Sequence, residues 1–326
     1  MNSKPVRFAI VGLGMGHVRA QTIHKTPGLA LTAVCDLNKE RLAKAAEEFK
    51  CATHENYDEM LKRDDVDVVM VMTPSGTHMD FAVKAAQAGK HILVTKPMEV
   101  APDRCMTMID AAAKAGVKLA VDYESRFFPD YVQMKSWADR GLFGEPILCE
   151  ARCKWWRTQA YYDAGGWRGT WKMDGGGALA NQGVHMLDLM LWFMGKPVQV
   201  YAQTAMAAHK IETEDVGLAI VNFESGARGV VVGTTTYAAG DQYGLDFNGK
   251  LGSFNTMNGS PVKYKFVDES QPTMGGASVP SNAMEDFAAA MREGRKPAVD
   301  GLEGKRAVDF LAAIYRSARE GKTVQM

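Results

Sequence analysis

The first 121 residues alternate short apolar runs with amphipathic segments, and this alternation is the strongest constraint on the fold. The apolar runs are rich in β-branched residues and almost free of charge; they span 6–11, 31–35, 66–72, 91–94 and 117–121. Strands of this kind are typical of a parallel sheet that is buried on both faces. Helical patterns separate them, at 17–25, 39–49, 77–88 and 102–115. The alternation therefore predicts right-handed βαβ units in a doubly wound α/β sheet.

After residue 122 the pattern changes. Strand-like runs follow one another closely, at 146–155, 198–205, 216–223, 227–235, 243–248 and 251–255. Helices are predicted at 128–140, 177–194, 282–293 and 302–319, an aromatic loop at 158–174, and a mobile loop at 271–280. Short strands with turn residues between them indicate an antiparallel or mixed sheet, open on one face and covered by helices on the other. We expect two α/β domains, 1–122 and 123–326, with the last helices packing back on the first.

Glycines crowd the turn that follows the first strand. Residues 12–17 are Gly-Leu-Gly-Met-Gly-His, so His17 stands where the third glycine of a strict G-x-G-x-x-G would be. Glycine permits a tight turn and lets the backbone approach a pyrophosphate at a helix N-terminus. Asp36 ends the next strand, where an acidic residue accepts hydrogen bonds from ribose hydroxyls and repels a 2′-phosphate. This context predicts a Rossmann domain that binds NAD; Lys39 and Arg41 keep NADP open as the less favoured cofactor. The glycine-turn residues expected to bind it are Gly12, Gly14, Met15 and Gly16.

Two further strand ends carry unusual residues. Thr73 and Pro74 follow the run 66–72, with His78 close behind, and Thr95-Lys96-Pro97 follow the run 91–94. Ligands of such sheets bind at the carboxyl ends of the strands. A lysine that ends a buried strand is seldom there for packing, because burying an unpaired ammonium is costly. We expect these residues to line the cofactor site; the alternative is that Lys96 simply extends to solvent.

The segment 174–194 begins with Asp174 and three glycines and continues as an almost wholly apolar helix. At about 100° per residue, Asn181, His185, Asp188 and Trp192 fall within about 60° of one another. A narrow polar stripe on a buried helix faces either a satisfied network or a ligand. Imidazole suits a base for a hydroxyl proton, and a fixed ammonium suits a developing alkoxide. We predict His185 as general base and Lys96 as proton relay or oxyanion partner, oriented by Asp188 or Asn181.

The chain resembles the Gfo/Idh/MocA oxidoreductase family over essentially its whole length. The glycine turn, Thr73-Pro74 with His78, Lys96-Pro97, and Gly175-Gly176-Gly177 followed by His185-Met186-Leu187-Asp188 occur in the family's order. The resemblance implies a Rossmann domain, a second domain with an open-faced sheet that often mediates oligomers, and a catalytic lysine and histidine, here Lys96 and His185. Two positions depart from the family. Thr95 stands in place of the Glu of a Glu-Lys-Pro motif, and Asn181 in place of the Asp of many inositol dehydrogenases.

Aromatic residues and arginines gather at 155–171. Aromatic faces commonly hold sugar rings, and arginine forks grip hydroxyls, carboxylates or phosphates. The alternative is a purely structural aromatic cluster. The side chains expected to bind substrate are Tyr123, Arg126, Arg157, Tyr162, Trp167, Arg168, Asn181 and Asp188.

Charge and cysteine content exclude several classes of protein. Lys plus Arg and Asp plus Glu both number 38, a balance that argues against capture of nucleic acid or of a membrane surface. The five cysteines form no C-x-x-C pair and no zinc set, so we expect reduced thiols and no metal site. The N-terminus has no apolar signal region, and no stretch is apolar enough to span a membrane. We expect a cytoplasmic protein.

The leading hypothesis is NAD-dependent oxidation or reduction of a secondary ring hydroxyl of a sugar, sugar nucleotide or cyclitol. A redox-cycling glycoside-cleaving enzyme with tightly bound NAD is one alternative, and a non-catalytic cofactor-sensing regulator is another. The resemblance also implies a homodimer or homotetramer formed through the C-terminal sheet.

Overall fold

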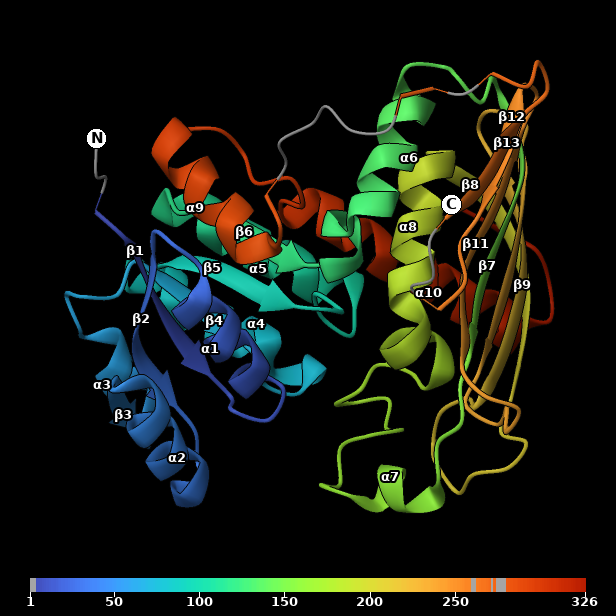
Figure 1. The fold of residues 1–326 in the computed structure, drawn as a ribbon. Coiled ribbons are helices and arrows are strands. Elements are labelled where there is room, and N and C mark those ends of the chain that lie inside the picture. The colour runs from blue at the N-terminus through green and yellow to red at the C-terminus, as the bar shows by residue number, and fades with distance from the viewer. Residues whose placement is uncertain (1–3, 259–261, 271, 274–279) are drawn as a thin grey trace. The chain divides into compact units, whose positions relative to one another are not determined.

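The computed structural model describes residues 4–258, 262–270, 272–273 and 280–326, and it divides into two compact units. Unit 1 contains Met1–Asp122 and Pro280–Lys305, and unit 2 contains Tyr123–Val279 and Arg306–Met326. Figure 1 shows the elements of both. Most of the predicted loop 271–280 lies outside the described residues.

Unit 1 is built around a six-stranded sheet with the order β3-β2-β1-β4-β5-β6, all of whose pairs are parallel. Its strands are β1 (Val6–Val11), β2 (Leu29–Cys35), β3 (Ala52–His54), β4 (Val68–Val71), β5 (His91–Thr95) and β6 (Leu119–Asp122). Its helices are α1 (Gly16–Lys25), α2 (Lys39–Phe49), α3 (Tyr57–Leu61), η1 (Ser75–Thr77), α4 (His78–Gln87), α5 (Pro102–Ala115) and α9 (Ala283–Glu293). Right-handed crossovers place α1 and α2 on one face and α4 and α5 on the other, so the prediction of a doubly wound sheet is confirmed.

Local chemistry explains where these helices begin and end. Asn38 accepts a hydrogen bond from the amide of Arg41 and so caps α2. Pro102 occupies the first turn of α5, and Gly116 ends that helix with a φ of 68°.

The segment that follows α9 returns to the edge of the parallel sheet. The amide of Val121 donates to the carbonyl of Val299, and Lys118 Nζ donates to the carbonyl of Arg295. A Cβ on Gly304 would lie 2.2 Å from Cγ2 of Val121. Glycine there lets the start of α10 (Gly301–Glu320) lie directly against β6.

Unit 2 contains an eight-stranded sheet with the order β13-β12-β11-β7-β10-β9-β8-β14, antiparallel except between β7 and β10. The strands are β7 (Pro146–Lys154), β8 (Pro197–Ala205), β9 (Val216–Phe223), β10 (Arg228–Thr234), β11 (Gln242–Gly249), β12 (Gly252–Asn255), β13 (Lys263–Phe266) and β14 (Val324–Gln325). The helices are η2 (Glu124–Phe127), α6 (Pro129–Asp139), α7 (Gln159–Asp163), the π-helix η3 (Ala178–Gly183) and α8 (Val184–Met194). The predicted mostly antiparallel sheet is confirmed.

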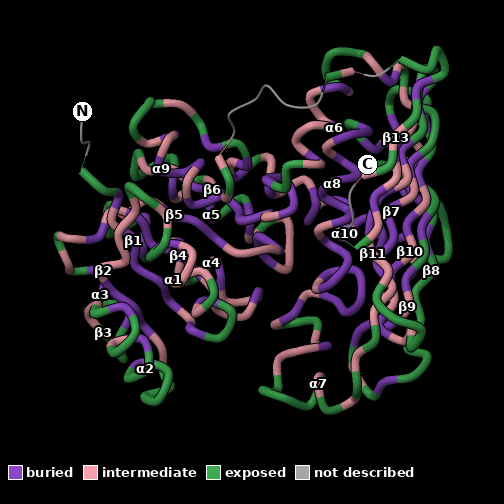
Figure 2. The backbone as a smooth tube through the Cα atoms, in the orientation of Figure 1, coloured by how far each residue is buried: buried purple, intermediate pink, exposed green. Residues whose placement is uncertain are grey.

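One face of this sheet carries the core of unit 2 and the other is open. Helix α8 packs on β7 and β11 and is buried almost all round, as Figure 2 shows. The ring of Phe143 stacks on that of Phe266 at 5.0 Å, within an aromatic cluster that includes Trp137. On the outer face, Leu218 and Ile220 of β9 are 45% and 59% exposed.

Several predicted boundaries need correction. The helix expected at 177–194 begins with a π-helical turn, and the loop expected at 158–174 contains α7. Strands β3, β13 and β14 and helix α3 are not predicted. Each is five residues or fewer, too short to produce a recognisable periodicity.

Candidate functional site

The three glycines of the turn in unit 1 differ in how closely other atoms approach them. Gly12 has a φ of 92°, and a Cβ there would lie 2.7 Å from the carbonyl oxygen of Met72. A Cβ on Gly16 would lie 3.0 Å from Cγ2 of Ile10, so glycine lets α1 approach β1. Around Gly14, nothing lies within 4 Å of the Cβ position. Gly16 therefore supplies the close helix–strand packing that the third glycine of the longer pattern provides, and the backbone at Gly14 is open to a ligand.

The start of α1 is suited to an anion. Met15, the residue at its N-cap, is 71% exposed, its side chain makes no capping bond, and the first turn holds no acidic residue. Free amide groups and the positive end of the helix dipole favour a phosphate at such a position. The residues of the turn therefore fit the pyrophosphate of a dinucleotide.

Asp36 is fixed beside the same turn. Its Oδ2 accepts a hydrogen bond from the amide of Leu13 at 2.6 Å, and its Oδ1 accepts one from Asn38 at 2.8 Å. Arg41 Nη1 lies 3.7 Å from Oδ2. The carboxylate is thus held at the end of β2, with a guanidinium close by.

His78 joins the loops that follow β4 and β5. It is fully buried; Nε2 lies 2.8 Å from the carbonyl of Thr73, and Nδ1 lies 3.1 Å from that of Pro97. Burial lowers its pKa, although these carbonyls act in the opposite direction. Pro74 precedes the short helix η1. Because both ring nitrogens of His78 face the backbone, its evident role is to hold these two loops together.

Lys96 lies directly after Thr95, the last residue of β5, and is half-buried; its peptide bond to Pro97 is cis. The buried carboxylate of Glu99 accepts a hydrogen bond from Arg104 Nε at 2.9 Å, and Arg104 also donates to the carbonyl of Gly76. This ion pair braces the loop that contains Lys96. Sequence reasoning missed it, although a glutamate among buried residues was a signal.

A second buried carboxylate lies at the end of the neighbouring strand. Asp122, the last residue of β6, is in register with Thr95 and accepts a hydrogen bond from Arg19 Nε of α1 at 2.6 Å. It was also not predicted. The strand ends near Lys96 therefore include a carboxylate, although position 95 itself has none.

In unit 2, the helix segment that carries His185 is anchored by buried charges. Glu214 accepts hydrogen bonds from the amides of Gly177 and Leu179, at 2.9 and 2.8 Å, and from the hydroxyl of Tyr315 at 2.9 Å. Burial raises the pKa of Glu214 to about 6. A Cβ on Gly176 would lie 2.1 Å from the Tyr315 hydroxyl, so these partners fit only against glycine. Glu214 and Tyr315 cap the π-helix from distant parts of the chain, and neither was predicted.

Glycines in the sheet also determine how closely this π-helix packs against it. A Cβ on Gly217 or Gly233 would lie 2.4 or 2.5 Å from side-chain carbons of Leu179. Leu179 therefore sits directly on the backbone of β9 and β10. Such contacts fix the height of the helix above the sheet.

The predicted polar stripe divides into two parts. Asp188 and Arg126 form a bidentate ion pair, with both N–O distances 2.7 Å, and are 1% and 5% exposed. The Arg126 guanidinium also lies 5.2 Å from the ring centre of Trp192. Nearer the helix start, Asn181 Nδ2 donates to Asp174 at 2.8 Å.

His185 follows Asn181 by one helical turn and is half-buried. The ring of Tyr123 meets its imidazole edge-on, with the ring centres 6.3 Å apart. An imidazole held in this way on an anchored helix can act as a general base.

The aromatic segment supplies the remaining predicted residues. Tyr162 is buried, and its hydroxyl lies 2.7 Å from that of Thr235; burial raises its pKa to about 12. Arg157, Trp167 and Arg168 gather close to Tyr161.

In the described part of the chain, no group of three His, Cys, Asp or Glu side chains is arranged to hold a metal ion. None of its helices is both long and apolar enough to cross a membrane.

Comparison with known proteins agrees with this architecture. Residues 6–123 match the family model described as an oxidoreductase family with an NAD-binding Rossmann fold, and residues 131–255 match the GFO/IDH/MocA C-terminal domain. The chain is 32% identical over 220 residues to D-glucoside 3-dehydrogenase of Escherichia coli; the match covers 66% of this chain and 61% of that enzyme. It is 25% identical to scyllo-inositol 2-dehydrogenase (NAD+) of Bacillus subtilis, over 98% of this chain and 96% of that one.

A solved structure extends the likeness to the whole chain. The WlbA dehydrogenase of Bordetella pertussis, crystallised with NADH and UDP-GlcNAcA, has a TM-score of 0.91 and 30% identity, covering 100% of this chain and 99% of that one. Together, the two matched domains and this full-length likeness show that the chain is an oxidoreductase of the Gfo/Idh/MocA family, with that family's NAD-binding Rossmann fold.

Proposed function

We propose that this enzyme is an NAD-linked dehydrogenase that oxidises or reduces a secondary ring hydroxyl of a sugar, sugar derivative or cyclitol. The observation that carries the proposal is His185, a half-buried imidazole on a helix that Glu214 and Tyr315 anchor at its start. An imidazole fixed in this way can accept a hydroxyl proton as a general base. The names of the relatives, which act on glucosides and inositols, agree with this choice of substrate class.

The chain's own residues divide the work as follows. Gly12, Gly14, Met15 and Gly16 would hold the pyrophosphate of the dinucleotide, and Asp36 would hold its adenosine ribose. The loops of Thr73-Pro74 and Thr95-Lys96-Pro97 would line its nicotinamide end. The bound dinucleotide would supply the hydride acceptor for the reaction. The role proposed for His185 is that of general base for the hydroxyl proton, and the role proposed for Lys96 is that of a cation that stabilises a developing alkoxide. Asn181, oriented by Asp174, keeps the polar side of the helix start in place.

NAD is the proposed cofactor in preference to NADP. The Asp36 carboxylate is already held by two backbone amides, and a fixed negative charge at this position repels a 2′-phosphate.

The direct test is a panel of inositols, hexoses, glycosides and nucleotide sugars, incubated with NAD and followed by absorbance at 340 nm. Net NADH formation with at least one member is the expected result. A redox-cycling enzyme would convert a glycoside without releasing NADH, and a regulator would convert nothing. Either outcome would replace the dehydrogenase assignment.

We also propose that the domain formed by 123–326 presents substrate and assembles the protein into a homodimer or homotetramer. Exposed apolar side chains on the open face of its sheet support this, namely Leu148, Tyr201, Leu218 and Ile220. Light scattering after gel filtration should give a mass of two or four chains, and Ile220→Lys should reduce it. A monomeric mass for the unaltered protein would contradict the proposal.

A further inference from the structure

Two arginines in unit 2 share one tyrosine ring. The guanidinium carbon of Arg157 lies 5.2 Å from the ring centre of Tyr161, and that of Arg168 lies 4.6 Å from it. Each arginine also lies over a tryptophan, Trp155 at 4.6 Å and Trp167 at 4.9 Å. Stacking of this kind holds a planar guanidinium in one orientation. Two positive charges are therefore fixed beside a single ring.

Neither charge is neutralised by the part of the chain that the structure describes. Among those residues, no carboxylate oxygen lies within 4.0 Å of either guanidinium, and each donates from Nη1 to a backbone carbonyl, that of Trp156 or of Ala164, at 2.8 Å. Arg126 and Arg152, in the same unit, both pair with carboxylates. Each guanidinium has five N–H donors, so both retain donors for a ligand. A half-buried positive charge that no carboxylate neutralises is stabilised when an anion binds to it.

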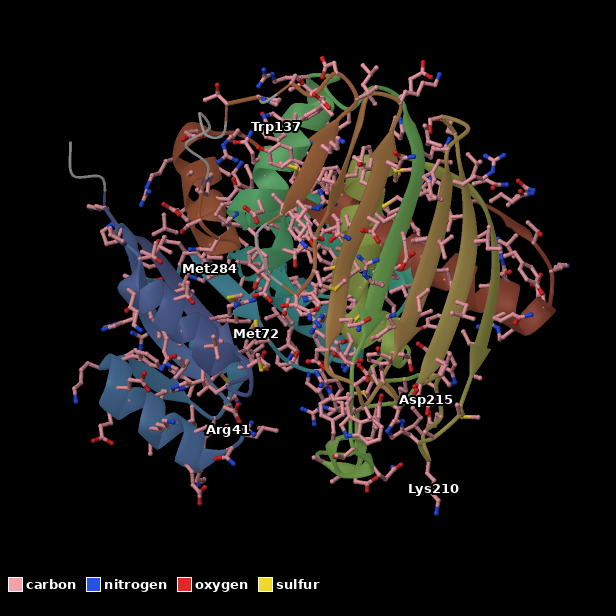
Figure 3. All side chains as sticks on the ribbon, turned by 45° about the vertical axis from the view of Figure 1, so that its right-hand side comes forward. Arg41, Met72, Trp137, Lys210, Asp215 and Met284 are labelled. Atoms are coloured by element: carbon pink, nitrogen blue, oxygen red, sulfur yellow. The ribbon has the colours of Figure 1, made fainter. Side chains whose placement is uncertain are left out.

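The backbone at Arg157 is held by a buried histidine and a buried aspartate. His209 Nε2 lies 2.8 Å from the Arg157 carbonyl, and His209 Nδ1 lies 2.9 Å from Asp215 Oδ2. Asp215 is fully buried and also accepts hydrogen bonds from the amides of Ala207 and Ala208, at 2.6 and 2.8 Å. Figure 3 labels Asp215 at the edge of the sheet domain where this segment lies, with Lys210 extending away from it. The arginine is thus part of a rigid structure rather than a free surface loop.

The shared tyrosine is tied to the helix of the proposed base. The Tyr161 hydroxyl accepts a hydrogen bond from Gln182 Nε2 at 3.0 Å. Gln182 belongs to the π-helix that runs directly into α8, three residues before His185. A group bound by the two arginines is therefore positioned from the same helix as the reacting hydroxyl.

We propose that Arg157 and Arg168 bind an anionic group of the substrate, a carboxylate or a phosphate, and that the enzyme selects acidic sugars over neutral ones. Both groups present paired oxygens that match the arginine fork. A neutral sugar would leave the two charges uncompensated. The inference rests on the proposed function for the placement of the sugar beside His185.

The test measures binding and turnover separately. Calorimetric titration of the NADH-loaded full-length protein would use a hexose, the corresponding hexuronate and the uridine diphosphate ester of the hexose. At least one anionic ligand should bind tenfold or more tighter than the hexose. Arg157→Gln and Arg168→Gln should each weaken binding of that ligand about tenfold or more, and should weaken binding of the hexose by a much smaller factor. Arg157→Lys, which keeps the positive charge, should weaken binding of that ligand by a smaller factor. Arg140→Gln, an exposed position at the end of α6, is the matched control and should bind as the unaltered protein does.

The anionic ligand whose affinity most exceeds that of the hexose shows which group the arginines bind. That group is a carboxylate if the ligand is the hexuronate, and a phosphate if it is the diphosphate ester. The inference would be overturned if the hexose bound as tightly as the better anionic ligand. It would also be overturned if neither anionic ligand bound, or if both glutamine variants bound them with unchanged affinity. Anion binding without any NADH formation in the parallel assay would leave the inference standing and contradict the dehydrogenase assignment. Thermal unfolding of every variant checks that the fold is retained, and Arg157→Lys keeps the test valid if a glutamine variant is unstable.

Discussion

In unit 1, steric contacts determine which residues can form the glycine turn that is proposed to hold the dinucleotide. In unit 2, buried carboxylates hold the helix that carries His185. Gly12 and Gly16 are required because a carbonyl or a methyl group lies where a side chain would be. The π-helix before His185 depends instead on the carboxylates of Glu214 and Asp174. Substitutions at these glycines should therefore act through steric overlap, and substitutions at Glu214 or Asp174 through their buried hydrogen bonds.

The largest effect is expected from Gly12→Ala. The new Cβ would meet the Met72 carbonyl at 2.7 Å, in a backbone conformation that costs alanine about 1–3 kcal/mol. NADH affinity, measured by fluorescence titration, should fall on the order of 100-fold, and the melting temperature should fall with it. Gly14→Ala is the matched control, because nothing lies within 4 Å of its Cβ position. It should weaken NADH binding without lowering the melting temperature. Equal melting temperatures for the two variants would contradict the claim that a Cβ at position 12 clashes with the Met72 carbonyl.

Glu214 should make the stability of unit 2 depend on pH. Its pKa is raised from 4.5 to about 6 in the folded protein, so the folded state binds the proton more tightly than the unfolded state. Its contribution is therefore favourable below about pH 4.5 and is lost as the pH rises through about 6, a change of about 2 kcal/mol. Urea unfolding across this range should show the loss in the unaltered protein and not in Glu214→Gln. Glu224→Gln, at an exposed position paired with Lys196, should keep the unaltered profile. Parallel profiles for the unaltered protein and Glu214→Gln would contradict the role given to this carboxylate.

A smaller effect is expected at Asp36. Asp36→Asn preserves the shape but removes the charge that is proposed to face the ribose, and it releases Arg41, whose Nη1 lies 3.7 Å from Oδ2. The preference for NADH over NADPH should narrow by about tenfold, as given by the ratio of the two dissociation constants. Asp58→Asn, in the exposed start of α3, should not change that ratio. An unchanged ratio in Asp36→Asn would show that another group selects the cofactor.

Sequence patterns identify the proposed dinucleotide-binding residues of unit 1 much better than the anchors of the His185 helix in unit 2. The ends of β1, α2 and α5 match the predicted ranges because buried strands, an asparagine cap and a proline in the first helical turn are local signals. The glycine turn is visible for the same reason, since Gly12 and Gly16 stand where neighbouring atoms leave little room for a Cβ.

The anchors of the helix that carries His185 could not be predicted. Glu214 and Tyr315 meet across 101 residues of chain, and no local pattern encodes that contact. The predicted stripe correctly placed Asp188 and Trp192 on one face, but the bond of Asp188 to Arg126 depends on how η2 packs against α8. Short edge strands such as β13, with lysines at alternate positions, resemble exposed loops in sequence.

The most direct test of the central claim is the turnover of His185→Ala with the best substrate from the panel, alongside its affinity for NADH. Loss of a general base should reduce kcat by about 100- to 10,000-fold and leave the dissociation constant of NADH within about twofold. His24→Ala, exposed on α1, should match the unaltered enzyme in both. Unchanged turnover in His185→Ala would contradict the account, because no proton would then pass through this imidazole.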